Sequence, residues 1–255
     1  MSGWTAILLA GSRPGTDPFA AAHGTDLKAL IPVGGKPMVR RPVETLLASP
    51  EVAAVRVLTQ QPERIGAVLP AASTLAVMAS QGTIAATLAT LCTDPATPWP
   101  LLVTTADHAL LDEAMVADFC ARAAGAGIAI AVVERAALTA RLPDSKRTWI
   151  PFKGGAYSGT NLFALGGPEA LAAIALWRAV EQDRKKGWRL LWRLGPVLFV
   201  GAMLRLLTLE QVLKRIGGKL ALDIRPVVMR DPLACVDVDK EADLTLVEQL
   251  LAERG

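Results

Sequence analysis

Short apolar runs alternate with stretches of helical periodicity over roughly the first half of the chain, and this alternation limits the possible folds more than any other feature. The aliphatic runs predict buried strands at 5–10, 53–59, 74–78, 100–105 and 128–133. Apolar residues at helical spacing predict helices at 39–47, 84–91 and 113–124, and a short helix beginning at Pro62. Strict alternation of strand and helix is typical of an α/β protein with a doubly wound, mostly parallel sheet.

The pattern changes in the second half of the chain. The predicted elements there are an extended stretch at 151–165, a mostly helical stretch at 169–216, strands at 220–228 and 234–238, and an amphipathic helix at 242–252. Glycines near 187, 195 and 217–218 predict breaks in the helical stretch. We expect a single domain over 1–255, with 167–219 as a helical insertion.

The net charge of +3 conceals a strongly basic segment. Residues 170–219 hold ten lysines and arginines and three acids, a net charge of +7, which leaves −4 for the rest of the chain. Within 184–205, Trp188 and Trp192 lie four residues apart, as do Arg189 and Arg193, so a helix would present neighbouring aromatic and basic stripes. These stripes predict peripheral contact with an anionic membrane. The alternative is that this face packs over a substrate or forms a homodimer.

Several classes of protein are excluded or disfavoured by what the sequence lacks. No recognised nucleic-acid-binding motif accompanies the basic residues, so we expect no nucleic-acid partner. We find no signal peptide and no apolar run near the ~20 residues that span a bilayer. We therefore expect a cytoplasmic protein, located at the inner face of the membrane if 184–205 binds lipid. The cysteines are scattered, which predicts reduced, structural thiols, and two histidines leave little room for a histidine-based metal site.

The first predicted strand runs into a glycine-containing turn suited to binding phosphate. The turn reads Leu9-Ala10-Gly11-Ser12-Arg13-Pro14-Gly15, and DLKALIPVGGKPM follows at 26–38 after a polar gap. Glycines allow backbone N–H groups to approach phosphate oxygens closely. Arg13 and Lys28 can neutralise the charge of a triphosphate as that charge shifts toward pyrophosphate.

Acidic residues near two later strands are candidate ligands for a hard cation. Asp107 closes the strand at 100–105, at the edge of the sheet where open α/β folds bind ligands. Asp237 and Asp239 lie at the end of the predicted strand 234–238, and alternation along that strand would put both on the same side. Oxygen-only ligands suit Mg²⁺ better than zinc. The alternative roles are helix caps, for which Asp112 is a better candidate than Asp107, and Asp239 could cap the last helix.

These segments resemble the MobA-like nucleotidyltransferases, a family that acts on sugar-phosphate, terpenoid-precursor and molybdopterin acceptors. The resemblance is carried by 28–37, which matches K-x-L-x-x-[LV]-x-G-[KR]-P, and by 237–244, which matches D-[IV]-D-x-x-x-D-L. The family's first motif is a strand followed by LAxG and a basic, glycine-containing loop, and the turn after the first predicted strand departs from it. The arginine lies closer to the glycine, and the following loop is longer, than is usual in the family. The resemblance implies a GT-A type, Rossmann-like sheet. It also implies Mg²⁺-dependent transfer of NMP from an NTP to a phosphorylated small-molecule acceptor, with release of pyrophosphate.

The resemblance assigns roles to individual residues. It implies that Lys28 and Arg13 are catalytic and that Asp107 and Asp237 bind Mg²⁺. It places the nucleotide against Leu9, Ala10, Gly11, Ser12, Gln81, Gly82 and Thr83, where Thr83 can also be a helix N-cap. It places the acceptor against Arg147, Lys153, Gly159, Thr160 and Asn161. The competing interpretation of the lysines and arginine around 146–153 is a solvated basic loop.

The nucleotide and two other functional classes stay open. We favour CTP, by analogy with the synthesis of lipid head groups. One alternative function is a GT-A-like glycosyltransferase, which would use a nucleotide-sugar and release a nucleoside diphosphate. The other is a non-catalytic nucleotide-binding scaffold associated with the membrane. The lysine-centred segment 28–37 favours triphosphate chemistry over both.

Overall fold

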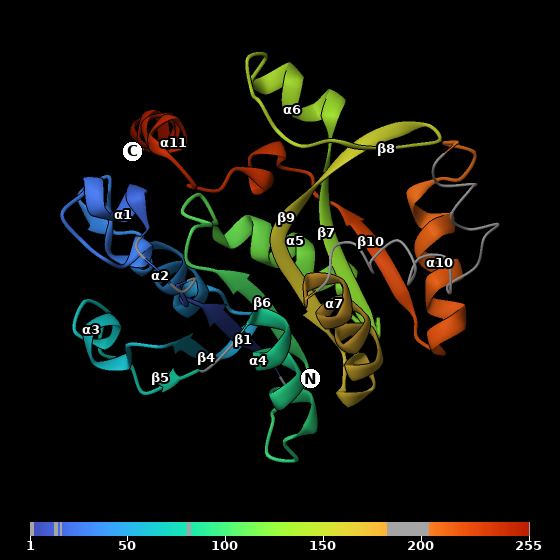
Figure 1. Ribbon diagram of the computed structural model, residues 1–255, viewed down its shortest axis with the longest axis horizontal. Coiled ribbons are helices and arrows are strands. Elements are labelled where there is room, and N and C mark those ends of the chain that lie inside the picture. The colour runs from blue at the N-terminus through green and yellow to red at the C-terminus, as the bar shows by residue number, and fades with distance from the viewer. Residues whose placement is uncertain (1–2, 13–14, 16, 81–82, 183–203, 255) are drawn as a thin grey trace.

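The structure is a computed structural model that describes residues 3–12, 15, 17–80, 83–182 and 204–254 (Figure 1). Its central sheet has the strand order β10-β7-β9-β6-β1-β4-β5, with β8 paired to β9. The strands are β1 (Trp4–Leu9), β4 (Val52–Thr59), β5 (Leu75–Ala79), β6 (Leu101–Thr105), β7 (Ile128–Glu134), β8 (Ile150–Phe152), β9 (Gly155–Leu165) and β10 (Ile224–Val228). The pairs β1–β4, β1–β6, β4–β5 and β7–β10 are parallel, whereas β9 is antiparallel to β6, β7 and β8. The predicted α/β fold with a mostly parallel sheet is confirmed.

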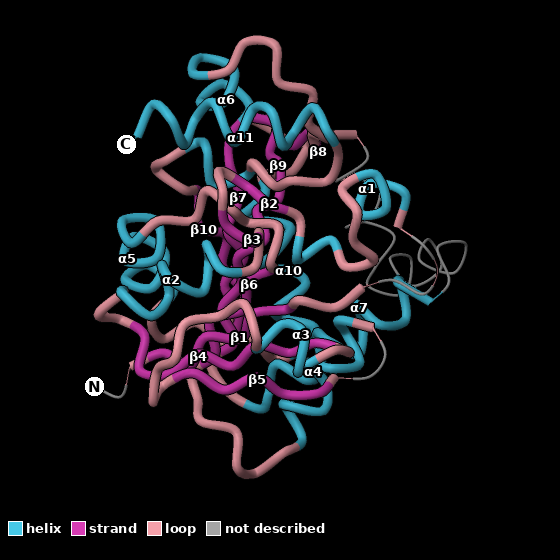
Figure 2. Tube along the Cα trace, turned by 90° about the vertical axis from the view of Figure 1, so that its left-hand side faces the viewer, coloured by secondary structure: helices cyan, strands magenta, loops and turns pink. Residues whose placement is uncertain are grey.

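Helices cover both faces of the sheet, because successive residues of its central strands are apolar and point to opposite faces. In β1, Ala6 and Leu8 pack on one face and Ile7 and Leu9 on the other. The first face is covered by α2 (Arg40–Ala48), α5 (Glu113–Ala123) and α11 (Glu241–Arg254). The second is covered by α4 (Ile84–Thr93), α7 (Leu171–Gln182) and α10 (Leu209–Leu220). Figure 2 shows the sheet between α2 and α5 on one side and α4 and α7 on the other.

Shorter elements complete the described fold. They are the helices α1 (Pro18–Ala22), α3 (Pro62–Gly66) and α6 (Arg135–Arg141), the 3-10 turns η1 (Lys28–Leu30), η2 (Pro168–Ala170) and η3 (Pro232–Cys235), and a small hairpin of β2 (Pro32–Val33) and β3 (Lys36–Pro37). In the part of the chain that the structure describes, no helix is both long and apolar enough to cross a membrane.

The order of the strands reverses at β1, because the later strands β4 and β6 lie on opposite sides of it, and this reversal is a switch point in the sheet. β1 pairs with β4 on one side and with β6 on the other, and Leu9 lies opposite Thr105 at the carboxyl ends of β1 and β6. The loops that follow these two strands therefore begin side by side. Open α/β sheets bind ligands in the crevice at such a point.

Two predictions of secondary structure were wrong. Residues 234–238 do not form a strand: Asp231 caps η3 by accepting from the Leu233 N–H at 2.8 Å, and an extended segment without sheet pairing follows. Gly217 and Gly218 do not end a helix but lie inside α10. A Cβ on Gly217 would lie 2.3 Å from the Leu222 oxygen, so the glycine allows the chain after α10 to fold back against the helix.

Candidate active site

The loop after β1 is fixed by the end of β4. The Ser12 N–H donates to Gln60 Oε1 at 3.0 Å. A Cβ on Gly11 would lie 3.0 Å from the same Gln60 amide, so glycine permits this close approach. Leu9 and Ala10 are buried at the base of the loop. Of the predicted nucleotide-binding turn, Arg13 lies outside the described residues.

Lys28 reaches from η1 to two carboxylates that come from distant parts of the chain. Its Nζ lies 2.8 Å from Asp107 Oδ2 and 2.5 Å from Asp239 Oδ1. Asp107 follows β6, where Thr105 Oγ1 donates to Asp107 Oδ1. Asp239 precedes α11; its Oδ1 contacts Lys28, and its N–H donates to Asp243 Oδ2 in the first turn of that helix at 3.2 Å.

Asn161 links Asp107 to the remaining carboxylate, Asp237. Its Nδ2 donates to Asp107 Oδ1 at 3.1 Å and to Asp237 Oδ2 at 3.3 Å. Arg147 forms an ion pair with Asp237 Oδ1, and its second terminal nitrogen lies 3.4 Å from the Asp237 carbonyl oxygen. These contacts therefore form one continuous network, which we call the carboxylate network; in order of contact its members are Asp239, Lys28, Asp107, Asn161, Asp237 and Arg147.

The backbone holds the network together as well. The Val238 N–H donates to the Asp107 carbonyl at 3.1 Å, which ties the segment before α11 to the loop after β6. In Figure 1 the chain that leads into α11 crosses the edge of the sheet near β9. Asp237 and Asp239 thus flank a residue that is anchored directly to Asp107.

The two inner carboxylates differ in their pKa. Burial would raise the pKa of Asp107, but the charge of Lys28 and hydrogen bonds from Lys28 and Thr105 lower it below its ordinary value. Burial raises the pKa of Asp237 despite Arg147, and the nearby charges of Asp239 and Asp107 add to the rise. Burial would lower the pKa of Lys28, yet its two carboxylate partners raise it, so Lys28 is charged at neutral pH. A bound cation would relieve the unfavourable charge on Asp237.

A buried histidine lies directly behind the network. His108 is 1% exposed, and its Nδ1 lies 3.3 Å from Thr104 Oγ1. Burial lowers its pKa to about 4, so it is neutral at physiological pH. It supports the loop after β6 from inside the core.

Of the other predicted nucleotide-side residues, one caps a helix and two lie outside the described residues. Thr83 caps α4 by accepting from the Ala86 N–H at 3.3 Å, as the alternative interpretation predicted. Gln81 and Gly82 lie outside the described residues. Asp112 caps α5, as predicted.

The predicted acceptor-side residues divide between the two faces of β9. Thr160 is 3% exposed and its hydroxyl donates to the Ala131 carbonyl at 3.2 Å, so it faces away from Asn161. The prediction that Thr160 binds the acceptor was therefore wrong. Gly159 is exposed, with open space where a side chain would be. Lys153 is exposed on the turn after β8.

The comparisons with known proteins identify the family. The model of the MobA-like NTP transferase domain matches residues 6–214. The chain belongs to the MobA-like NTP transferase family. The family match includes Lys28, Asp107 and Asn161 but ends before Asp237 and Asp239. No curated protein sequence matches this MobA-like NTP transferase.

Solved structures agree with the family fold. A hypothetical transferase from Thermus thermophilus is 29% identical with a TM-score of 0.80, and the alignment covers 95% of this chain and 100% of that one. The 4-diphosphocytidyl-2C-methyl-D-erythritol synthase from Anaerococcus prevotii is 10% identical, with a TM-score of 0.60 and coverage of 98% and 96%. A CMP:2-keto-3-deoxy-manno-octonic acid synthetase complexed with CTP is 16% identical, with a TM-score of 0.58 and coverage of 99% and 100%. The last two likenesses show the fold.

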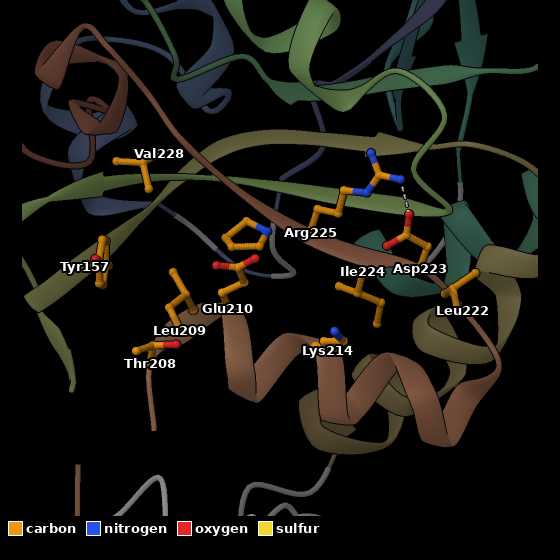
Figure 3. Close-up of a pocket in the computed structure, with 11 residues that line it drawn as sticks. Tyr157, Thr208, Leu209, Glu210, Lys214, Leu222, Asp223, Ile224, Arg225 and Val228 are labelled. Carbon is orange, nitrogen blue, oxygen red and sulfur yellow. Dashed lines mark ion pairs between the residues drawn. The ribbon is translucent and has the colours of Figure 1, made fainter. Parts of the chain in front are cut away.

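A cavity lies elsewhere in this MobA-like NTP transferase, between α10 and β10. Its volume is about 620 Å³, and Figure 3 shows α10 on one side and β10 on the other, with Tyr157 near Thr208 at one end. Its charged lining includes Asp223 and Arg225, which pair with each other. No member of the carboxylate network lines this cavity. Most of the basic segment 184–205 lies outside the described residues, and Leu204 and Arg205 are exposed.

Proposed function

We propose that this MobA-like NTP transferase moves the NMP part of an NTP onto a phosphorylated small-molecule acceptor and releases pyrophosphate. The observation that carries the proposal is the convergence of Lys28, Asp107 and Asp237 beside the loop after β1, at the switch point of the sheet. CTP is the first nucleotide to test, because the synthetase with the same fold holds CTP.

The loop after β1 and Lys28 would bind the triphosphate. The backbone of Leu9, Ala10, Gly11 and Ser12 lies at the carboxyl end of β1, the edge of the sheet where open α/β folds bind ligands. Lys28 would exchange Asp239, its more exposed partner, for phosphate oxygens. Its charge would then stabilise the negative charge that develops on the leaving pyrophosphate.

The carboxylate network fits the Mg²⁺ that the family implies. Asp107 and Asp237 supply oxygen ligands that Asn161 holds close together. Among the described residues there is no group of three or more His, Cys, Asp or Glu side chains that could form a closed metal cage. Mg²⁺ commonly binds through one or two carboxylates, with phosphates and water completing its shell. When bound, the ion would neutralise charge on the nucleotide phosphates and favour attack on the α-phosphorus.

The acceptor would approach along β9 on the side of Arg147. An oxygen of its phosphate attacks the α-phosphorus, the bond from that phosphorus to the β-phosphate oxygen breaks, and pyrophosphate leaves. The attacking oxygen is already deprotonated near neutral pH, so the reaction needs no general base. Arg147 and Lys153 would bind the acceptor phosphate, and exposed Gly159 leaves room for its remaining atoms.

A screen for pyrophosphate release tests the proposal. Purified protein with Mg²⁺ would be incubated with each of four NTPs and with sugar phosphates, polyol phosphates, phosphocholine and molybdopterin-type acceptors. The proposal predicts pyrophosphate release that requires both an NTP and one acceptor class. Release of a nucleoside diphosphate from a nucleotide-sugar would instead indicate a glycosyltransferase. NTP binding without turnover would indicate a scaffold.

The proposals for the basic segment need separate tests. Membrane contact through 184–205 predicts co-sedimentation with liposomes that contain anionic lipid and loss of binding at high salt. A homodimer through the same segment predicts a doubled mass in solution without lipid. Binding to neutral and anionic liposomes alike, or to neither, would argue against electrostatic membrane contact.

A further inference from the structure

We infer that Asn161 is a positioning residue for the metal ligands and not a contact of the acceptor. The inference rests on the proposed function, because it assigns Asn161 to the two carboxylates that would hold the divalent ion. Specifically, the amide of Asn161 lies between the two carboxylates and sets the distance between them. Three observations carry it.

The first observation is how the amide uses its two hydrogens. Nδ2 donates to Asp107 Oδ1 at 3.1 Å and to Asp237 Oδ2 at 3.3 Å, so one nitrogen joins both carboxylates. A neutral amide can donate twice without adding a charge that would compete with a cation. The opposite oxygen of each carboxylate is bound by Lys28 or Arg147. Each carboxylate is therefore held at both oxygens.

The second observation is a bulge in β9 that places Asn161 at this point. Phe163 pairs with Ile130 of β7, but Gly159 pairs with Val132, so three residues of β9 lie opposite Ala131 alone. Asn161 is the middle one of the three. The Thr160 hydroxyl, which donates to the Ala131 carbonyl at 3.2 Å, fixes the bulge from the opposite face. Bulges beside active sites commonly redirect a side chain in this way.

The third observation is the register of β9 against β6. Leu162 pairs with Thr104, so Asn161 lies beside Thr105, the last residue of β6. Asp107 follows two residues later, and Thr105 donates to the same Oδ1 atom as Asn161. Strand pairing, and not the flexible end of a loop, therefore sets the position of the amide.

This arrangement has a consequence for cation binding. Two carboxylates held close together repel each other. The two N–H donors offset part of the repulsion before any cation arrives. Groups that orient metal ligands in this way typically contribute 10- to 100-fold in metal affinity.

The test is direct Mn²⁺ binding to the full-length protein without nucleotide or acceptor, followed by electron paramagnetic resonance of the free ion. Asn161→Ala removes both donors and should weaken Mn²⁺ binding about 10- to 100-fold. In turnover assays the same variant should raise the Mg²⁺ concentration needed for half-maximal rate and leave the acceptor KM unchanged. Lys153→Ala, on the acceptor side, should show the reverse pattern. Asn161→Leu, of similar volume, serves if the alanine variant does not fold.

The inference is overturned if Asn161→Ala binds Mn²⁺ as wild type does while its acceptor KM rises, or if wild type binds no Mn²⁺. A separate outcome concerns the proposed function alone. If wild type binds Mn²⁺, the variant does not, and no NTP yields pyrophosphate, the positioning role of Asn161 stands and the transferase reaction does not.

Discussion

The carboxylate network and the cavity beside α10 both contain acids and bases, but they are built differently. The network joins six side chains from distant segments of the chain, and each charge touches an opposite charge or an amide donor. In the cavity the paired charges, Asp223 and Arg225, are two residues apart in sequence. The cavity has a volume of about 620 Å³ but contains no member of the network. Convergence of charge from distant segments is the better guide to the reaction site.

The strongest challenge to this contrast is to neutralise the centre of the network. Asp107→Asn keeps the shape of the side chain and removes the charge that Lys28 contacts at 2.8 Å. We expect pyrophosphate release to fall about 10³-fold, as when a preorganised charge-stabilising group is removed. Circular dichroism should show a folded protein. Wild-type turnover in a folded Asp107→Asn variant would remove the network from the mechanism.

Neutralising the other inner carboxylate should have a smaller effect. In Asp237→Asn the position retains an oxygen ligand, and Asp107 and Lys28 keep their contact. We therefore expect a loss of about 10²-fold in steady-state turnover, partly recovered at high Mg²⁺. A loss as large as that of Asp107→Asn would mean that the two carboxylates contribute equally.

Chelation sharpens the same comparison. Removing divalent ions with EDTA should abolish turnover, and added Mg²⁺ should restore it, because Asp107 and Asp237 supply oxygen ligands of the kind that Mg²⁺ prefers. Activity that survives exhaustive chelation would mean that Lys28 and Arg147 suffice to neutralise the phosphates.

The cavity supplies the matched control. Lys214→Ala removes a positive charge from the cavity lining, which includes no residue of the network. We expect turnover and the acceptor KM to equal those of wild type. A raised acceptor KM would instead show that the acceptor extends into the cavity, and the contrast between the two regions would have to be redrawn.

The smallest effect concerns the buried thiols. Burial raises the pKa of Cys235 to about 11 and that of Cys120 to about 12, so at pH 8 both hold far less thiolate than an exposed thiol does. We expect neither to react with a thiol reagent in the folded protein, and both to react in denaturant. Cys235 lies two residues before Asp237, so its rapid labelling in the native state would show that this part of the network opens.

The fold and the first half of the site could be predicted because they depend on local pattern. Apolar runs predicted the two strands that end just before Gly11 and Asp107. Because these strands pair in parallel, their carboxyl ends lie together. Periodicity could not show the bulge in β9, which separates Asn161 from Thr160 by facing them to opposite sides.

The last acidic motif shows the same limit. Alternation along a strand was the wrong reason to place Asp237 and Asp239 together, since Asp231 and η3 turn this segment out of the sheet. Both carboxylates still join the network, because Asp237 forms an ion pair with Arg147 and Asp239 forms one with Lys28. The predicted helix break at 217–218 was wrong for a related reason. Gly217 allows a close contact with the chain that follows α10, and no local sequence pattern reveals that contact.

The most direct test of the account is the stoichiometry of one complete reaction, followed by mass spectrometry with the NTP and acceptor that the screen selects. The account predicts that each NTP consumed yields one pyrophosphate and one acceptor heavier by a nucleotidyl group. Formation of a nucleoside diphosphate, or of inorganic phosphate with an unmodified acceptor, would contradict it.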